Sequence, residues 1–182
     1  INSIDGDHDE TVTINAGAGA VSVGRIGGSN ALSSPDDVEG IKSVAITSSH
    51  ATGITLSGNI TTSDTSDSDV TLSGDVVISG DVDIDTSQGT DGSIEFTKTI
   101  KGACGTDNLT LDTGDDNLTF HATNTTIGVG DKPLTSLNIG QNGGTAAITV
   151  PQIGDANDDG VSGTVLIGTS TSTSVTMRDQ LY

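Results

Sequence analysis

The chain has 182 residues, a formal net charge of −19 and only six Lys and Arg residues, a balance that argues against DNA or RNA as a partner. Aromatic residues make up 2% of the chain, and there is no Trp. Because compact globular cores usually contain several large aromatic side chains, this core must be built from many Val, Ile, Leu and Ala side chains instead.

Turn-forming residues dominate the polar part of the sequence. Subtracting three Glu residues from the 25 acidic residues leaves 22 Asp, and there are 25 Gly. Asp and Gly favour turns, so the sequence predicts many short strands rather than acidic helices. Cys104 is the only cysteine, which excludes an internal disulfide. No apolar stretch is as long as a membrane span, so we expect no membrane insertion by this segment.

Short alternating strands recur along the chain with a nearly constant step. The pattern apolar–x–apolar–(small or acidic) occurs at residues 54–57, and further copies begin at Val82, Leu109, Leu137 and Val165. Each of these copies starts about 28 residues after the one before it, as expected of a structural repeat. An earlier copy at residues 12–15 is separated from the next by a longer step. The excess matches a predicted loop insertion at residues 27–40, "GGSNALSSPDDVEG".

Each copy is followed by a second alternating strand, and spare apolar residues allow a third. The second strands are predicted at residues 21–23, 70–72, 94–96, 118–120, 148–150 and 175–177. Candidates for the third strand are residues 44–46, Ile78, Ile100 and residues 127–129. The stretch "DVTLSGDVVISGDVDID" at residues 69–85 is interpreted as consecutive faces of one coil, with Asp75 and Asp81 near the corners.

Period-2 strands separated by Gly and Asp turns exclude a helical repeat and predict an all-β fold. A unit of about 28 residues is typical of one coil of a parallel β-helix, or β-solenoid, in which stacked coils bury a shared core. The alternative is an antiparallel β-sandwich built from the same strands. We expect residues 1–182 to form a single solenoid segment of a longer repetitive protein. Since solenoid ends expose unpaired strand edges, we also expect end-to-end self-association of the segment.

Several stretches resemble the repeats of very large bacterial surface and secreted proteins, the filamentous-haemagglutinin-like adhesins and autotransporter-type passengers. The resemblance rests on "VTINAGAGAVSVGRIGGSNALSS", "LTLDTGDDNLTF" and "VTLSGDVVISGDVDIDT", with "DKPLTSLNIG" and "RDQLY" in the same phrasing. The stretch "PDDVEG" at residues 35–40 departs from it. The resemblance implies a right-handed parallel β-helix that serves as a stalk or adhesive shaft at the bacterial cell surface or outside the cell. The implied partner is a cell-surface or matrix target, protein or glycan.

Calcium is the one metal for which the sequence offers candidate ligands. "DANDDG" places Asp155, Asn157 and Asp159 at alternate positions before a glycine, like the first half of an EF-hand loop. Two weaker candidates are the alternating set Asp5, Asp7 and Asp9, and the pair Asp85 and Asp112, which we expect to stack in successive coils. The competing interpretation is that these aspartates are solvated turn residues.

Catalysis is not predicted from the sequence. Many parallel β-helices cleave polysaccharides, and such sites combine carboxylates with a basic residue and aromatics. Here carboxylates are plentiful, but Arg25 and Arg178 lie near opposite ends and aromatics are scarce. The run "TSTSTSVT" at residues 169–176 is similar to the threonine arrays of ice-binding solenoids, yet Thr-x-Thr does not recur on one face of each coil. We therefore expect a non-enzymatic structural or adhesive segment, with a polysaccharide-degrading enzyme or a passive spacer stalk as alternatives.

Overall fold

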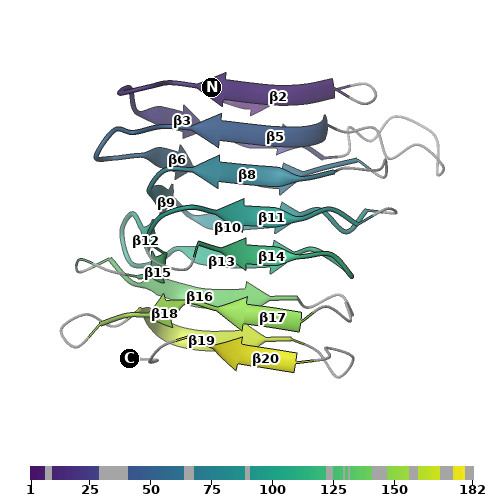
Figure 1. Ribbon diagram of the computed structural model, residues 1–182. Coiled ribbons are helices and arrows are strands. Elements are labelled where there is room, and N and C mark those ends of the chain that lie inside the picture. Colours follow the sequence, from purple (N-terminus) through teal and green to yellow (C-terminus); the bar gives the residue numbers. More distant parts are fainter. Residues whose placement is uncertain are drawn as a thin grey trace.

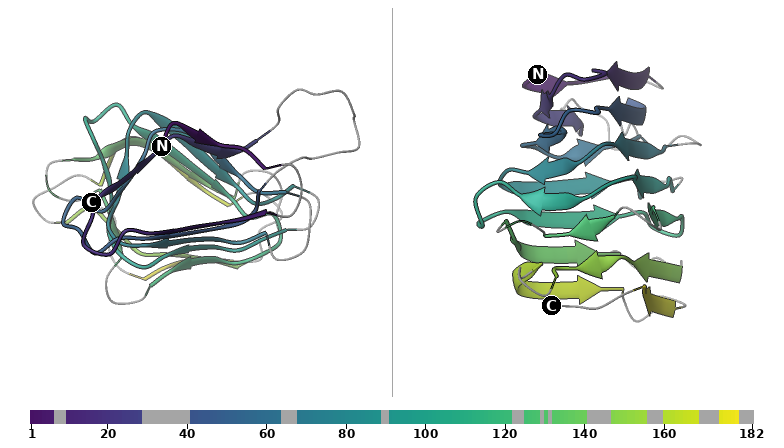
Figure 2. Two further views of the ribbon diagram at one scale, coloured as in Figure 1. Left: turned by 90° about the horizontal axis from the view of Figure 1, so that it is seen from above. Right: turned by 60° about the vertical axis from the view of Figure 1, so that its left-hand side comes forward.

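The structure is a computed structural model that describes residues 1–6, 10–28, 41–63, 68–88, 91–121, 125–128, 130, 132–140, 147–155, 160–168 and 174–178. Within these ranges every regular element is a β-strand. The strands stack in layers along one axis and enclose a roughly triangular cross-section (Figures 1 and 2). Because it contains no helix, the described part of the chain offers no helix that could cross a membrane.

Three parallel sheets form the three faces of the solenoid. Face A contains β1 (Ser3–Ile4), β4 (Arg25–Gly27), β7 (Ile60–Thr61), β10 (Asp81–Asp85), β13 (Asn108–Asp112), β16 (Leu134–Ile139) and β19 (Val161–Ile167). Face B contains β2 (Glu10–Asn15), β5 (Ile41–Thr47), β8 (Val70–Ser73), β11 (Ile94–Phe96) and β14 (Leu118–Phe120), followed by the pair β17 (Ala147–Val150) and β20 (Ser174–Met177). Face C contains β3 (Val21–Val23), β6 (Ile54–Leu56), β9 (Val76–Ile78), β12 (Ile100–Gly102), β15 (Thr126–Ile127) and β18 (Gln152–Ile153).

The chain visits the faces in the fixed order A, B, C, and the coil is right-handed. Seen from the N-terminal end, the chain runs clockwise from face B through face C to face A while moving away from the viewer (Figures 1 and 2). This is the hand that twisted parallel strands adopt when a connection returns to the same sheet. The predicted right-handed parallel β-helix is thus confirmed, and the antiparallel sandwich is excluded because the strands pair in parallel.

The predicted repeat is confirmed on face A of the C-terminal half. Val82 pairs with Leu109, Leu109 with Leu137, and Leu137 with Val165, as the regular step of the sequence requires. The stretch at residues 69–85 also forms three consecutive faces, as β8, β9 and β10. Its interpretation as faces of one coil was therefore correct.

The phase predicted for the N-terminal half was wrong. The regular step predicts that Ile54 stacks on Val82, but Ile54 lies on face C and pairs with Val21 and Val76. The strand that precedes β10 on face A is β7, where Ile60 pairs with Ile84. The number of residues per coil varies in this half. Many more residues separate the paired strands β4 and β7 than separate the paired strands β6 and β9. A constant step of about 28 residues therefore leads from a strand of one face to a strand of another face in this half, as from Ile54 on face C to Val82 on face A.

The predicted loop insertion at residues 27–40 falls between faces A and B. Gly27 ends β4 and Gly28 follows it, whereas residues 29–40 lie outside the described residues. Turns at other corners have strict steric requirements. Gly128 has φ +71°, and a Cβ at this position would lie 1.8 Å from the carbonyl oxygen of Gly160 in the next coil. Only glycine permits such a close approach of two coils.

The core consists of inward-facing side chains that stack from coil to coil. Alternation along each strand sends one set of residues inward and the next outward. Val70 and Leu72, for example, are fully buried and stand opposite Ile94 and Phe96 of the next coil. Phe96 and Phe120 are both 0% exposed and stack with their ring centroids 5.6 Å apart. The two phenylalanines of the chain thus pack on each other inside a core of aliphatic ladders.

Removing one of these rings should destabilise the whole stack. We expect Phe96→Ala to lower the free energy of unfolding by about 3–5 kcal/mol, because it leaves a cavity between two coils. Urea unfolding followed by far-UV circular dichroism measures the change. Thr119→Ala, on the exposed side of the neighbouring strand, is the matched control and should shift stability by less than about 0.5 kcal/mol. Equal urea midpoints for Phe96→Ala and the control would contradict this core.

Candidate functional site

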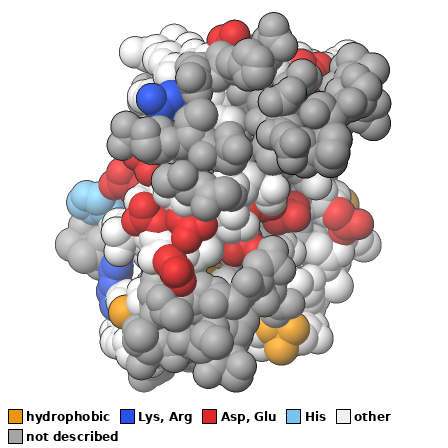
Figure 3. Space-filling view, turned by 90° about the vertical axis from the view of Figure 1, so that its right-hand side faces the viewer, with side chains coloured by type: hydrophobic (Ala, Val, Ile, Leu, Met, Phe, Trp, Pro, Cys, Tyr) orange, Lys and Arg blue, Asp and Glu red, His pale blue; other side chains and the backbone are white. Residues whose placement is uncertain are grey.

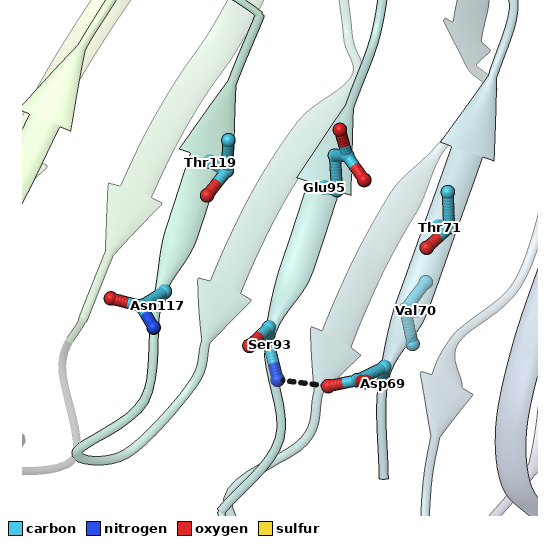
Figure 4. A pocket seen from close by; sticks show the side chains of 7 residues that line it. All are labelled: Asp69, Val70, Thr71, Ser93, Glu95, Asn117 and Thr119. Carbon is cyan, nitrogen blue, oxygen red and sulfur yellow. Dashed lines mark hydrogen bonds between the residues drawn. The ribbon is translucent and has the colours of Figure 1, made fainter. Parts of the chain in front are cut away.

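A groove of about 330 Å³ lies on the outer side of face B. It spans three consecutive strands, β8, β11 and β14, so three coils contribute to it (Figure 4). The lining residues are Asp69, Val70, Thr71, Ser93, Glu95, Asn117 and Thr119. All of these except Val70 have polar side chains, and two of them are carboxylates.

The centre of the groove is a row of side chains in register. Thr71 pairs with Glu95, and Glu95 pairs with Thr119. Their neighbours along each strand, such as Ile94 and Phe96, point into the core, so these three point outward. Paired strands lie about 4.8 Å apart. A carboxylate is therefore flanked on both sides by threonine hydroxyls along the solenoid axis.

A second row forms one rim of the groove and is held by hydrogen bonds. The backbone N–H of Ser93 donates to Oδ1 of Asp69 at 2.8 Å, the interaction drawn in Figure 4. The hydroxyl of Ser93 donates to Oδ1 of Asp116 at 3.1 Å. The same oxygen accepts the backbone N–H of Asn117 at 2.7 Å and its side-chain amide at 3.0 Å. The positions of this rim are thus fixed before any ligand arrives.

Glu95 differs from the rim residues. Its side chain is partly buried, and within the described residues its carboxylate makes no hydrogen bond or ion pair. Ionised carboxylates have room for several hydrogen-bond donors. Glu95 is therefore the lining group best placed to receive donors from a bound molecule.

The groove is part of a longer row on face B. From β2 to β14 the row reads Thr13, Ala45, Thr71, Glu95 and Thr119. Thr149 and Thr176 form a paired continuation on β17 and β20. Strict Thr-x-Thr does not recur in every coil, as the sequence indicated, but a single row of mostly threonines does. This row and the central position of Glu95 were not predicted. Thr71, Glu95, Thr119, Thr149 and Thr176 lie in predicted second strands, whereas Thr13 lies in a predicted first strand and Ala45 in a candidate third strand.

The predicted stacking of Asp85 and Asp112 is confirmed, because the two residues pair in register on face A. Oδ1 of Asp85 accepts the N–H and the hydroxyl of Ser87 at 2.9 and 2.7 Å, and Oδ2 accepts the amide of Gln88 at 2.5 Å. Oδ1 of Asp112 accepts the N–H of Gly114 at 3.1 Å. Asp85 and Asp112 end their strands at the edge of the solenoid where face A meets face B. Acidic side chains gather across the middle of this edge (Figure 3). These contacts give both carboxylates a role in their own turns.

The other calcium candidates are only partly described. Asp5 forms an ion pair with Arg25, at 2.5 Å between Oδ1 and the guanidinium. Asp155 follows β18, in a coil later than that of Asp112. Asp7, Asp9, Asn157 and Asp159 lie outside the described residues. Among the residues that are described, no group of three or more His, Cys, Asp or Glu is arranged to hold a metal ion. Calcium binding stays a prediction.

Two aspartates in β10 and in the turn before β13 have opposite electrostatic environments. Burial raises the pKa of Asp83 to about 6, with further contributions from the charges of Asp85 and Asp112. Asp107 is also buried, which by itself raises its pKa, but backbone N–H groups outweigh this effect and its pKa lies below the usual 3.8. The donors include the backbone N–H groups of Cys104 at 2.8 Å, of Gly105 at 3.2 Å and of Gly80 in the preceding coil at 2.7 Å. Asp107 thereby links two coils.

The chain matches no protein-family model, no characterised protein and no solved structure. The solenoid and the groove on face B are therefore the basis on which a function can be inferred.

Because their pKa values are shifted in opposite directions, substitution of Asp83 and of Asp107 should change the free energy of unfolding in opposite directions. The folded-state pKa of Asp83, about 6, exceeds its unfolded value near 3.8, so its ionisation costs stability as the pH rises through 6. Asp83→Asn should raise the free energy of unfolding at pH 7 by about 1 kcal/mol, after allowance for solvent screening, and by progressively less towards pH 4.

Asp107 has a lowered pKa, so its contribution is present at neutral pH and is lost as the pH falls through its folded-state value. Asp107→Asn should destabilise the protein at pH 7 by about 2 kcal/mol, because it removes charge-assisted hydrogen bonds. Thermal melts of both variants between pH 3 and 8 provide the measurement. If both variants shift the melting temperature in the same direction at pH 7, the opposite electrostatic environments of Asp83 and Asp107 are contradicted.

Proposed function

We propose that this chain is a non-enzymatic structural and adhesive segment of a very large bacterial cell-surface or secreted protein. The observation that carries the proposal is the mostly polar outer surface of face B, which extends along five hydrogen-bonded strands, with Ala45 as an apolar member of its central row, and holds the groove. A target that is itself extended can follow such a row over several coils. The resemblance of the repeats to those of bacterial adhesins supports an extracellular location.

The fold suits a shaft. Parallel hydrogen bonds and a continuous core tie each coil to its neighbours, so a solenoid behaves as a stiff rod. Its outward side chains can change from coil to coil without loss of the core. The net charge of −19 favours solubility and disfavours partners with strong negative charge. These properties support a role in holding a contact surface away from a cell.

A cell-binding assay tests the adhesive role. Beads coated with the chain are counted after incubation with cells and with matrix-coated surfaces. We expect the double variant Thr71→Arg and Thr119→Arg to reduce attachment about tenfold, because the added side chains fill the groove and cancel the charge of its two carboxylates. Thr55→Arg, at an outward position of face C, is the matched control and should attach like the wild type.

The assay has two results that contradict the adhesive role. If wild-type beads attach to no surface, the segment is a passive spacer. If the groove variant attaches as well as Thr55→Arg, attachment does not use face B. Circular dichroism spectra of all variants establish that the fold is retained.

A second candidate function, polysaccharide cleavage, is favoured by the presence of two carboxylates in one groove. Asp69 and Glu95 occupy diagonal positions of adjacent strands, and residues in such positions are roughly 7–8 Å apart. Carboxyl pairs of glycosidases have comparable separations. However, Oδ1 of Asp69 already accepts the N–H of Ser93, which favours a structural role for it. Release of reducing ends from polysaccharides, abolished by Glu95→Gln, would establish the enzyme and overturn the leading proposal.

A further inference from the structure

We propose that the groove on face B binds a glycan that carries free amino groups, with the ammonium of one sugar at Glu95. This inference rests on the proposed adhesive function and names the class of its target. Three independent features of the groove support it: its charge, its hydrogen-bonding groups and its dimensions.

Charge is the first feature. Glu95 and Asp69 place two carboxylates in the groove, and none of its lining residues is Lys, Arg or His. The Glu95 carboxylate makes no hydrogen bond or ion pair with the described residues, so no Lys or Arg among them neutralises its charge. A ligand ammonium would supply both the missing charge and hydrogen-bond donors. Sulfated or carboxylated glycans would instead meet like charge, in a chain whose net charge is −19.

Hydrogen-bonding capacity is the second feature. Thr71 and Thr119 stand on either side of Glu95, and a threonine hydroxyl can both donate and accept. Sugar hydroxyls have the same dual capacity, so each can pair with these groups in either direction. Asn117 adds a side-chain amide at the rim. Val70 is the one apolar lining residue, so the groove has little to offer an apolar peptide.

Dimensions and rigidity are the third feature. A volume of about 330 Å³ lies at the lower end of the range for small-molecule sites and suits a short stretch of a glycan. The row of outward side chains continues beyond the groove to Ala45 and Thr13 on neighbouring strands. The rim is fixed by the Ser93–Asp69 and Ser93–Asp116 hydrogen bonds, so binding requires little ordering of the protein.

Calorimetric titration with two hexasaccharides of the same backbone tests the proposal. The first is the glucosamine hexamer, which carries ammonium groups at pH 6; the second is its N-acetylated form, which is uncharged. We expect saturable binding of the glucosamine hexamer at about 20 mM salt and weaker binding at about 200 mM, since salt screens the ammonium–carboxylate attraction. The N-acetylated hexamer should bind at least about tenfold more weakly, because it cannot form that charged contact.

Variants locate the site. Glu95→Gln should weaken binding of the glucosamine hexamer about tenfold or more, through loss of a hydrogen bond to a charged group. Asp81→Asn, on face A, removes the same unit of charge far from the groove and should leave the affinity unchanged. Thr71→Val should weaken binding severalfold, whereas Thr55→Val, an outward position of face C, should not.

Several results would overturn the proposal. These are absence of binding, equal affinity for the two hexamers, or equal effects of Glu95→Gln and Asp81→Asn, which would indicate attraction by net charge alone. Tighter binding of a hexalysine peptide that also depends on Glu95 would assign the groove to basic peptides instead. Attachment of coated beads to cells despite any of these results would leave the adhesive function intact and exclude only this ligand.

Discussion

No coil of this chain encloses a core by itself, and the stacking of each coil on the next is the constraint on which the rest of the structure depends. On face B the inward residues Val44, Val70, Ile94 and Leu118 stand opposite one another in successive strands. Each is buried only because its neighbours above and below cover it. The parallel hydrogen-bond ladder fixes the register, and a slip of one residue would send every apolar side chain to the outside.

The same register organises the outer surface. Once the inward residues are aligned, the residues between them form rows with the spacing of the strands, whatever their chemistry. Glu95 thus lies between two threonines in the groove without any special turn or loop. Corners have their own requirements, met by glycine at Gly128 and by the carboxylate of Asp107, which accepts N–H groups from two coils. Asp83 shows the cost of an outward carboxylate that is partly buried next to two others.

Much of the fold could be predicted because alternation and the repeat are local signals. The triplets around Thr71, Glu95 and Thr119 were recognised as strands, and the step on face A from Val82 to Val165 was correct. The N-terminal phase was wrong because corners tolerate insertions and deletions, so coil length is not constant. A constant step would pair Ile54 with Val82, whereas the hydrogen bonds of the sheet pair it with Val76.

The groove was not predicted, although its central residues lie in the predicted second strands at 70–72, 94–96 and 118–120. Its central residues on face B follow one another at a shorter step than the one that relates Val82 to Leu109 on face A, so the dominant repeat does not align them. The stacking of Asp85 and Asp112 was predictable because these residues do follow the dominant step. The donors that occupy their carboxylates were not, since turn geometry rather than the repeat brings them there; they belong to Ser87, Gln88 and Gly114.

The most direct test of this account is a set of distances along face B. Spin labels at Thr13 and Thr119, in a chain with Cys104→Ser, span four strand spacings, and labels at Thr13 and Thr176 span six. Pulsed electron paramagnetic resonance should give backbone separations of about 19 Å and about 29 Å, since the distance grows by one spacing per coil. Equal distances for the two pairs, or a shorter one for Thr13 and Thr176, would contradict the parallel stack and with it the row of side chains that forms the groove.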